Sequence, residues 1–298
     1  MSPLTSPIAS QELSPSSDLD AKAERSHFFR ENGYTQPVFL ADASKVKTLS
    51  NAINQFSQRR KQIKFSILSP PYGDRKAHVF SKLVFELATD TVILDTLSSC
   101  LGEDILIWLG QVITRKPKSK GQAWHIDQIN WEVDGVHASI AITDMTLDNG
   151  CLQVIPKTHL YNLGQTELEA KAKLADASLW DGEAMVALAD QLHPENAPHQ
   201  LVSLEVKAGQ TFLTKGGIWH GVTRSTSEQP RGALVARYMR PDVAGKEAGR
   251  PLPCVLISGT DTGQKNTLFH APQPWFKRDV LLNYRFNKLL AKLAKIVS

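Results

Sequence analysis

The spacing of hydrophobic residues changes near residue 102. Before that point apolar side chains recur every three or four positions, as in Val46, Leu49, Ile53 and Phe56, which is typical of amphipathic helices. The pair Asn32-Gly33 is a good helix end. The pattern predicts helices over residues 18–32, 45–61, 76–88 and 91–102.

After residue 102, short apolar and β-branched stretches alternate with turn signals such as Asp134-Gly135 and Asn149-Gly150. We expect strands over 104–117, 137–145, 151–156, 199–206, 210–216, 218–224 and 233–239. Many short strands with helices before and behind them predict a mainly β fold, a sandwich or barrel packed by helices.

The two ends and one internal stretch differ from this body. Residues 1–17 hold six Ser and three Pro, so we expect a flexible tail. We expect residues 18–298 to form a single domain. Its helical features are an insertion at about 165–192 and a closing helix at about 275–297. A long insertion in such a barrel is a candidate lid over its mouth.

Composition excludes several classes of protein. The 298 residues are 42% apolar and carry a formal charge of only +4, which argues against disorder and against nucleic acid as a partner. Cys100, Cys151 and Cys254 share no close spacing, which argues against a disulfide framework and a structural zinc site. No apolar run could span a membrane, and no secretory signal is evident. We expect a cytoplasmic monomer or homodimer that acts on a small molecule.

The densest group of polar and aromatic residues is AWHIDQINWEVDG, over 123–135. His125 and Asp127 are two positions apart, so in an extended segment they face the same side. An imidazole and a carboxylate presented together offer two ligands to a metal ion. His-x-Asp also occurs often by chance, so the pair needs a third ligand from elsewhere in the fold.

His220 is the best candidate for that third ligand, because it lies late in the strand-rich region in KGGIWHGVTR. Arg231 follows after a turn, at the start of a strand that would run antiparallel to the His220 strand. Two His and one carboxylate form the facial triad of non-heme Fe(II) oxygenases, which leaves positions for a 2-oxo acid and O2. A buried Arg can hold the remote carboxylate of that acid through two parallel bonds.

Three segments carry a family resemblance: WHID with the later Trp and Asp-Gly, TLDNGCLQVIPKTH, and WHGVTRSTSEQPRGALVARY. Over about residues 26–240 the chain resembles the phytanoyl-CoA dioxygenase family of Fe(II)/2-oxoglutarate oxygenases. The resemblance implies a double-stranded β-helix, a jelly-roll barrel with iron at its mouth. It also implies Fe(II) as cofactor and 2-oxoglutarate and O2 as co-substrates.

The resemblance assigns roles to particular residues. His125, Asp127 and His220 match the metal ligands, and Arg231 matches the anchor for 2-oxoglutarate. Three further positions match or lie near residues that contact the co-substrate: Gln111, Thr114 and Trp131.

Three other residues are candidate substrate contacts. Gln128 stands where ectoine hydroxylases of the family carry an aromatic residue, so the resemblance does not extend to ectoine as substrate. Arg237 lies six positions after Arg231 and so on the same face of an extended strand. It could bind substrate, form a rim salt bridge or be the true anchor. Trp219 adjoins a predicted ligand and could be part of the wall.

The sequence therefore predicts an Fe(II)/2-oxoglutarate dioxygenase that hydroxylates an unactivated C–H bond of a small metabolite or natural-product intermediate. The co-substrate would become succinate and CO2. Desaturation, epoxidation, cyclisation and hydroxylation of a lipid or acyl thioester stay open within the same class. A zinc hydrolase and a barrel that only binds are the alternatives from other classes.

Overall fold

The computed structural model describes residues 15–51, 75–79, 81–127, 135–247 and 250–272. The expected helices are present as α1 (Pro15–Asn32), α3 (Lys82–Ala88) and α4 (Thr91–Leu101), and residues 44–51 are helical. A short 3-10 turn, η2 (Ala77–Val79), precedes α3. Helix α1 begins three residues before the expected start. The closing helix at 275–297 and most of the tail lie outside the described residues.

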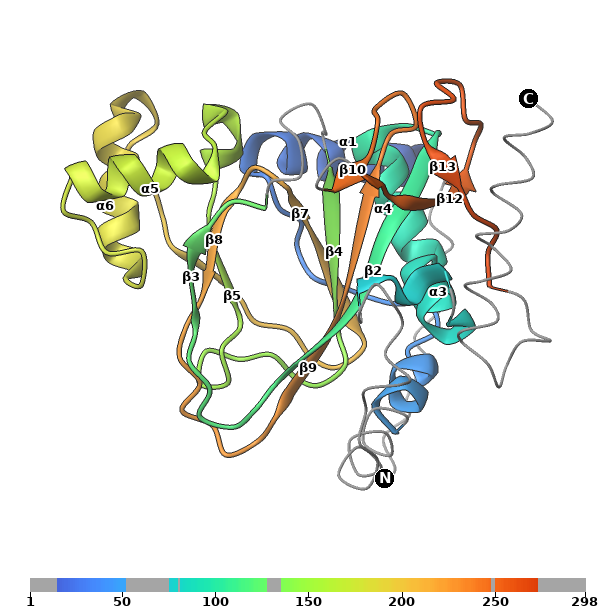
Figure 1. The fold of residues 1–298 in the computed structure, drawn as a ribbon, viewed down its shortest axis with the longest axis horizontal. Helices are drawn as coiled ribbons and strands as arrows, with labels where there is room; N and C mark the ends of the chain where they lie inside the picture. Colours follow the sequence, from blue (N-terminus) through green and yellow to red (C-terminus); the bar gives the residue numbers. More distant parts are fainter. Residues whose placement is uncertain (1–14, 52–74, 80, 128–134, 248–249, 273–298) are drawn as a thin grey trace, which may run out of the picture.

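Two sheets face each other, as a jelly roll requires, and their strands pair antiparallel except for the parallel pair of β12 and β13 (Figure 1). The large sheet has the order β1-β7-β4-β9-β2-β12-β13 and the small sheet β3-β8-β5-β6. The large sheet comprises β1 (Val38–Phe39), β7 (Gln210–Lys215), β4 (Val136–Ala141), β9 (Arg231–Met239), β2 (Ile105–Arg115), β12 (Pro253–Ser258) and β13 (Thr267–Leu268). The small sheet comprises β3 (Gln122–His125), β8 (Trp219–Val222), β5 (Leu152–Ile155) and β6 (Val202–Leu204). Strands β10 (Lys246–Glu247) and β11 (Arg250–Pro251) pair with each other.

The helices α1, α3 and α4 cover the side of the large sheet that faces away from the small sheet (Figure 1). Their apolar side chains form one core with the sheet, which includes the fully buried Phe29, Ile93, Leu97, Ile107 and Leu234. This layer buries one face of the large sheet and leaves its other face to the barrel interior. The three cysteines are free thiols. No helix among the described residues is long and apolar enough to cross a bilayer.

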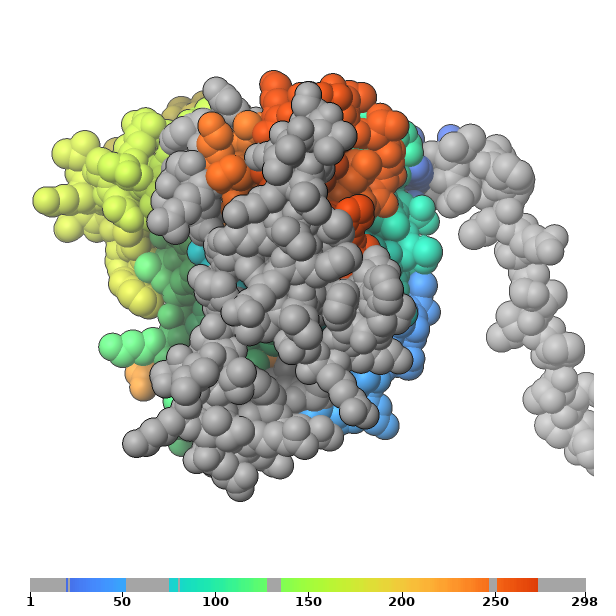
Figure 2. All heavy atoms as spheres, turned by 45° about the vertical axis from the view of Figure 1, so that its right-hand side comes forward, coloured from blue at the N-terminus to red at the C-terminus, as the bar shows by residue number. Residues whose placement is uncertain are grey.

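The expected helical insertion consists of α5 (Gln165–Leu174) and α6 (Gly182–Leu192). Both helices share a buried cluster with Trp124, Ile126 and Trp219 from β3 and β8 and the residues beside them. They stand beside the small sheet in Figure 1 and form a projection at the left of Figure 2.

Hydrogen bonds from two backbone amides attach the insertion to β3 and to the residue that follows it. The Trp124 amide donates to the Leu179 carbonyl at 2.7 Å, and the Ile126 amide donates to Gln165 Oε1 at 2.8 Å. A lid that opens requires few buried contacts. The insertion instead has the contacts of a fixed support behind β3.

A hydroxyl group joins the helical layer to the sheet. Tyr238 of β9 is fully buried, and its hydroxyl donates to the Ala88 carbonyl at 2.7 Å, at the last residue of α3. Carbonyls at a helix end lack helical partners, so this bond satisfies one of them.

Replacing Tyr238 with Phe should lower the free energy of unfolding by about 1–2 kcal/mol, because a buried carbonyl loses its donor. Urea unfolding followed by circular dichroism measures this change. Tyr34→Phe is the matched control, since the Tyr34 hydroxyl makes no hydrogen bond to another described residue, and it should change stability by less than half as much. Equal effects of the two substitutions would contradict the role of the Tyr238 bond.

Candidate metal centre

The pairing of β3 with β8 brings the two predicted histidine ligands together. His125 and His220 are direct partners in the antiparallel register, and their ring centroids lie 4.1 Å apart. Directly opposed residues in a sheet project to the same face. The two imidazoles, 95 positions apart in the chain, therefore point into one space.

Asp127 completes the set two residues after the end of β3. Its Oδ1 lies 3.9 Å from His125 Nε2, and its Oδ2 lies 3.7 Å from His220 Nε2. One donor atom from each of these residues lies within 4.8 Å of the others. Two imidazole nitrogens and a carboxylate oxygen on one side of a site form a facial donor set for a divalent metal.

Backbone carbonyls fix the tautomers of both histidines. His125 Nδ1 lies 2.8 Å from the Ala123 carbonyl, and His220 Nδ1 lies 2.9 Å from the Ile218 carbonyl. Each Nδ1–H therefore donates outward and leaves the Nε2 lone pair for the centre, as metal-binding histidines require. Burial lowers the pKa of His220 to about 4, so its imidazole is neutral. The Nε2 lone pair of His125 accepts the Gln122 amide at 2.9 Å, and a metal that binds His125 would replace this hydrogen bond.

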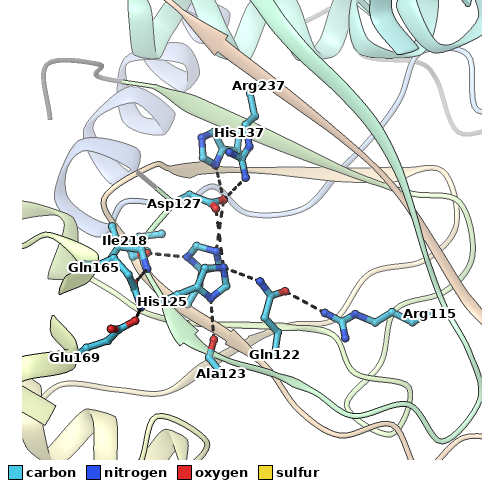
Figure 3. A network of polar contacts seen from close by, with 12 residues as sticks. Arg115, Gln122, Ala123, His125, Asp127, His137, Gln165, Glu169, Ile218 and Arg237 are labelled. Carbon is cyan, nitrogen blue, oxygen red and sulfur yellow. Dashed lines mark hydrogen bonds and ion pairs between the residues drawn. The ribbon is translucent and has the colours of Figure 1, made fainter. Parts of the chain in front are cut away.

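The ligand carboxylate is held from the opposite side by Arg237 and His137 (Figure 3). Arg237 Nη2 lies 2.6 Å from Asp127 Oδ2, and His137 Nδ1 lies 3.3 Å from it. Burial alone would raise the pKa of Asp127. The hydrogen bond from His137 and the charge of Arg237 outweigh burial and hold that pKa well below its usual value.

His137 is a site residue that the sequence did not reveal, because nothing near it in the chain marks it. It reaches Asp127 because it is the register partner of Arg237 across β4 and β9. Arg237 is not at the rim: it pairs with Asp127 inside the barrel, and its guanidinium lies 5.5 Å from the buried Trp108 ring. Of the three roles expected for Arg237, the salt bridge comes nearest, but the bridge to Asp127 lies inside the barrel and not at its rim.

A cavity of about 110 Å³ contains this cluster and extends to Arg231. Arg231 is buried and donates to the Gly150 carbonyl at 2.7 Å and to Met145 Sδ at 2.9 Å, while its Nε has no partner. No carboxylate of the described residues forms an ion pair with it. Burial, together with the charge of Arg115, lowers its pKa to about 10. An unpaired buried guanidinium in a cavity fits the carboxylate of a ligand.

The other residues predicted to contact co-substrate or substrate do not all lie at the cavity. Gln111 is half-buried on β2, with the same strand parity as Ile113 and Arg115, which line the cavity. Thr114 is exposed and does not line the cavity, because alternation turns it to the other face. Trp219 is also not a lining residue: it is fully buried on the outer side of β8, against Tyr161. Trp131 and Gln128 lie outside the described residues.

A jelly-roll barrel with a two-histidine, one-carboxylate donor set is typical of mononuclear non-heme metal oxygenases. The model of the family described as phytanoyl-CoA dioxygenase matches residues 29–233. The chain belongs to this family. Membership confirms the resemblance expected from the motifs, and with it the class of Fe(II)/2-oxoglutarate oxygenase.

Individual relatives are distant. Ectoine dioxygenase of Sphingopyxis alaskensis is 24% identical over 252 residues, which cover 78% of this chain and 79% of the relative. The non-heme monooxygenase ThoJ, solved as a nickel complex, is 20% identical with a TM-score of 0.64, covering 92% of this chain and 98% of ThoJ. CytC3, solved with Fe(II) and alpha-ketoglutarate, is 18% identical with a TM-score of 0.56, covering 82% and 91%. These structures confirm the expected fold.

Replacing Arg237 with Met should weaken divalent metal binding by about 10- to 100-fold, because Asp127 loses the group that orients it. Calorimetric titration with Co(II) measures this. Arg240→Met is a matched control, since Arg240 pairs with Asp242 on the surface, and its metal affinity should equal that of the wild type. An unchanged dissociation constant in Arg237→Met would mean that Asp127 needs no support from Arg237.

Proposed function

We propose that the protein is an Fe(II)/2-oxoglutarate-dependent hydroxylase of a small metabolite. One observation carries the proposal: a single cavity joins a facial donor set to a buried guanidinium that no carboxylate of the described residues pairs with. The first feature suits a metal with open positions, and the second suits the far end of a keto-diacid. Membership in the phytanoyl-CoA dioxygenase family supports the same pairing.

In this proposal His125, Asp127 and His220 hold the iron. The bound iron supplies the redox chemistry that couples O2 and 2-oxoglutarate to C–H oxidation, with succinate and CO2 as by-products. The protein supplies the geometry: imidazoles with fixed tautomers, and a carboxylate kept ionised by Arg237 and His137. Because Asp127 is ionised before any metal arrives, metal binding need not displace a proton from it.

Arg231 binds the remote carboxylate of 2-oxoglutarate and so orients the co-substrate. The guanidinium is anchored by the Gly150 carbonyl and sits at the start of β9, so its direction is fixed before ligand binds. The walls between it and the ligands include the apolar Ile113, Leu152 and Val235. An apolar wall limits water around the reacting centre and strengthens the charge pairing at its end.

The cavity argues against the hydrolytic alternative. A zinc hydrolase of this ligand type needs a further carboxylate as general base. Asp127 is the only carboxylate among the described lining residues, and it belongs to the donor set itself. A barrel that only binds would not need the tautomer control seen at both histidines.

The proposed substrate is a small molecule, as the modest cavity volume favours. The test is an untargeted comparison in which purified protein, Fe(II), ascorbate and 2-oxoglutarate are incubated with a metabolite extract in air and without O2. We expect O2-dependent succinate and a product that has gained one oxygen atom. A product that has instead lost two hydrogens would indicate desaturation. Cleavage that proceeds without O2 or 2-oxoglutarate would overturn the proposal.

Replacing Arg231 with Ala should raise the 2-oxoglutarate concentration needed for half-maximal succinate formation by about 30-fold or more, since a buried charge pair is lost. Iron affinity should stay within about twofold of the wild type, because no ligand changes. If the affinity for 2-oxoglutarate were unchanged, another guanidinium of the cavity, and not that of Arg231, would be the anchor.

Replacing Asp127 with Ala should abolish hydroxylation, because the donor set loses its only anion. Product formation under saturating iron measures this. Asp144→Ala is the control: that carboxylate pairs with Lys207 on the surface and should be dispensable for activity. Full activity in the Asp127 variant would contradict the proposed triad.

A further inference from the structure

A second guanidinium lies next to the proposed anchor. Arg115 is the last residue of β2 and Arg231 is the first of β9, and the two are direct partners in the antiparallel register. Opposed residues project to the same face of a sheet, and both side chains line the cavity. Two like charges are therefore built side by side at one end of the site.

Neither charge is balanced by a carboxylate of the described residues. Arg115 donates to the Lys120 carbonyl at 3.2 Å and to Gln122 Oε1 at 3.1 Å, both neutral acceptors. Arg231 likewise donates only to Gly150 and Met145. Burial lowers the pKa of Arg115, and the charge of Arg115 contributes to the lowered pKa of Arg231. Adjacent guanidiniums that repel each other in a partly dry site are stabilised by a shared anion.

A purely structural role for Arg115 would be to close the turn before β3 through the Lys120 carbonyl. A neutral side chain could make that bond without placing a second cation beside Arg231. The two bonds of Arg115 also use only part of its donor capacity, since a guanidinium carries five N–H groups. The remaining donors are available to the cavity.

Gln122 connects this end of the cavity to the metal ligands (Figure 3). Its Oε1 accepts from Arg115, so its amide nitrogen must point to His125 Nε2, at 2.9 Å. The reverse orientation would set two donors against each other. Arg115, Gln122 and His125 thus form a continuous polar line from the guanidinium pair to the donor set.

We propose that Arg115 is a second arm of the co-substrate site, and that its guanidinium binds the same distal carboxylate of 2-oxoglutarate as Arg231. This inference rests on the proposed function. One carboxylate has two oxygens and about four acceptor sites, which is enough for two guanidiniums. A paired anchor makes the site selective for 2-oxo acids with a second carboxylate over those without one.

The test is anaerobic calorimetric titration of the Co(II)-loaded protein with two ligands. One is 2-oxoglutarate, and the other is 2-oxopentanoate, which has the same chain length but no distal carboxylate. Arg115→Gln should weaken 2-oxoglutarate binding by at least about 10-fold, the range for a lost bond to a charged group, and 2-oxopentanoate binding by less than about twofold. Arg115→Lys, which keeps the charge, should recover part of the loss.

Arg224→Gln is the matched control, because Arg224 is exposed and does not line the cavity; it should bind both ligands as the wild type does. Unchanged 2-oxoglutarate affinity in Arg115→Gln would overturn the proposal. An equal loss for both ligands would also overturn it, since that result means a distorted site. Failure of the wild type to bind 2-oxoglutarate at all would instead refute the proposed function.

Discussion

The antiparallel pairing of β3 with β8 is the constraint on which the site depends. It sets His125 opposite His220, and a slip of one residue would turn one imidazole to the outside of the sheet. The insertion fixes β3 from behind through Leu179 and Gln165. The insertion, which its length alone marks as a candidate lid, therefore packs as a support for β3, the strand that carries His125.

Charge is the second organising feature of the cavity. Among the described residues, three guanidiniums, of Arg115, Arg231 and Arg237, and one carboxylate, of Asp127, line it. Arg237 is already paired with Asp127 at 2.6 Å, which keeps that carboxylate ionised and oriented. The other two are left for an anion that enters from solution, and a keto-diacid supplies it. The protein thus combines a pair of imidazoles with fixed tautomers at one end of the cavity with an excess of positive charge at the other.

Local patterns predicted much of this, but long-range register could not be read from them. The spacing of His125 and Asp127 and the turn before Arg231 are local signals, and the helices and most strands follow from periodicity. His137 reaches Asp127 only through the β4–β9 register, and Arg115 meets Arg231 only through β2–β9. Alternation along β2 places Thr114 on the face away from the cavity and its neighbour Arg115 on the face toward it. Strands β12 and β13 carried no distinct signal.

We expect the residues that strand pairing brings together to bind one metal ion and a keto-diacid in one cavity. Crystals grown without O2 in the presence of Fe(II) and 2-oxoglutarate would test it by anomalous diffraction at the iron edge. We expect a single iron peak in bonding contact with His125 Nε2, Asp127 and His220 Nε2, and continuous density from the iron to Arg231. An iron peak elsewhere, or 2-oxoglutarate bound away from Arg231, would contradict it.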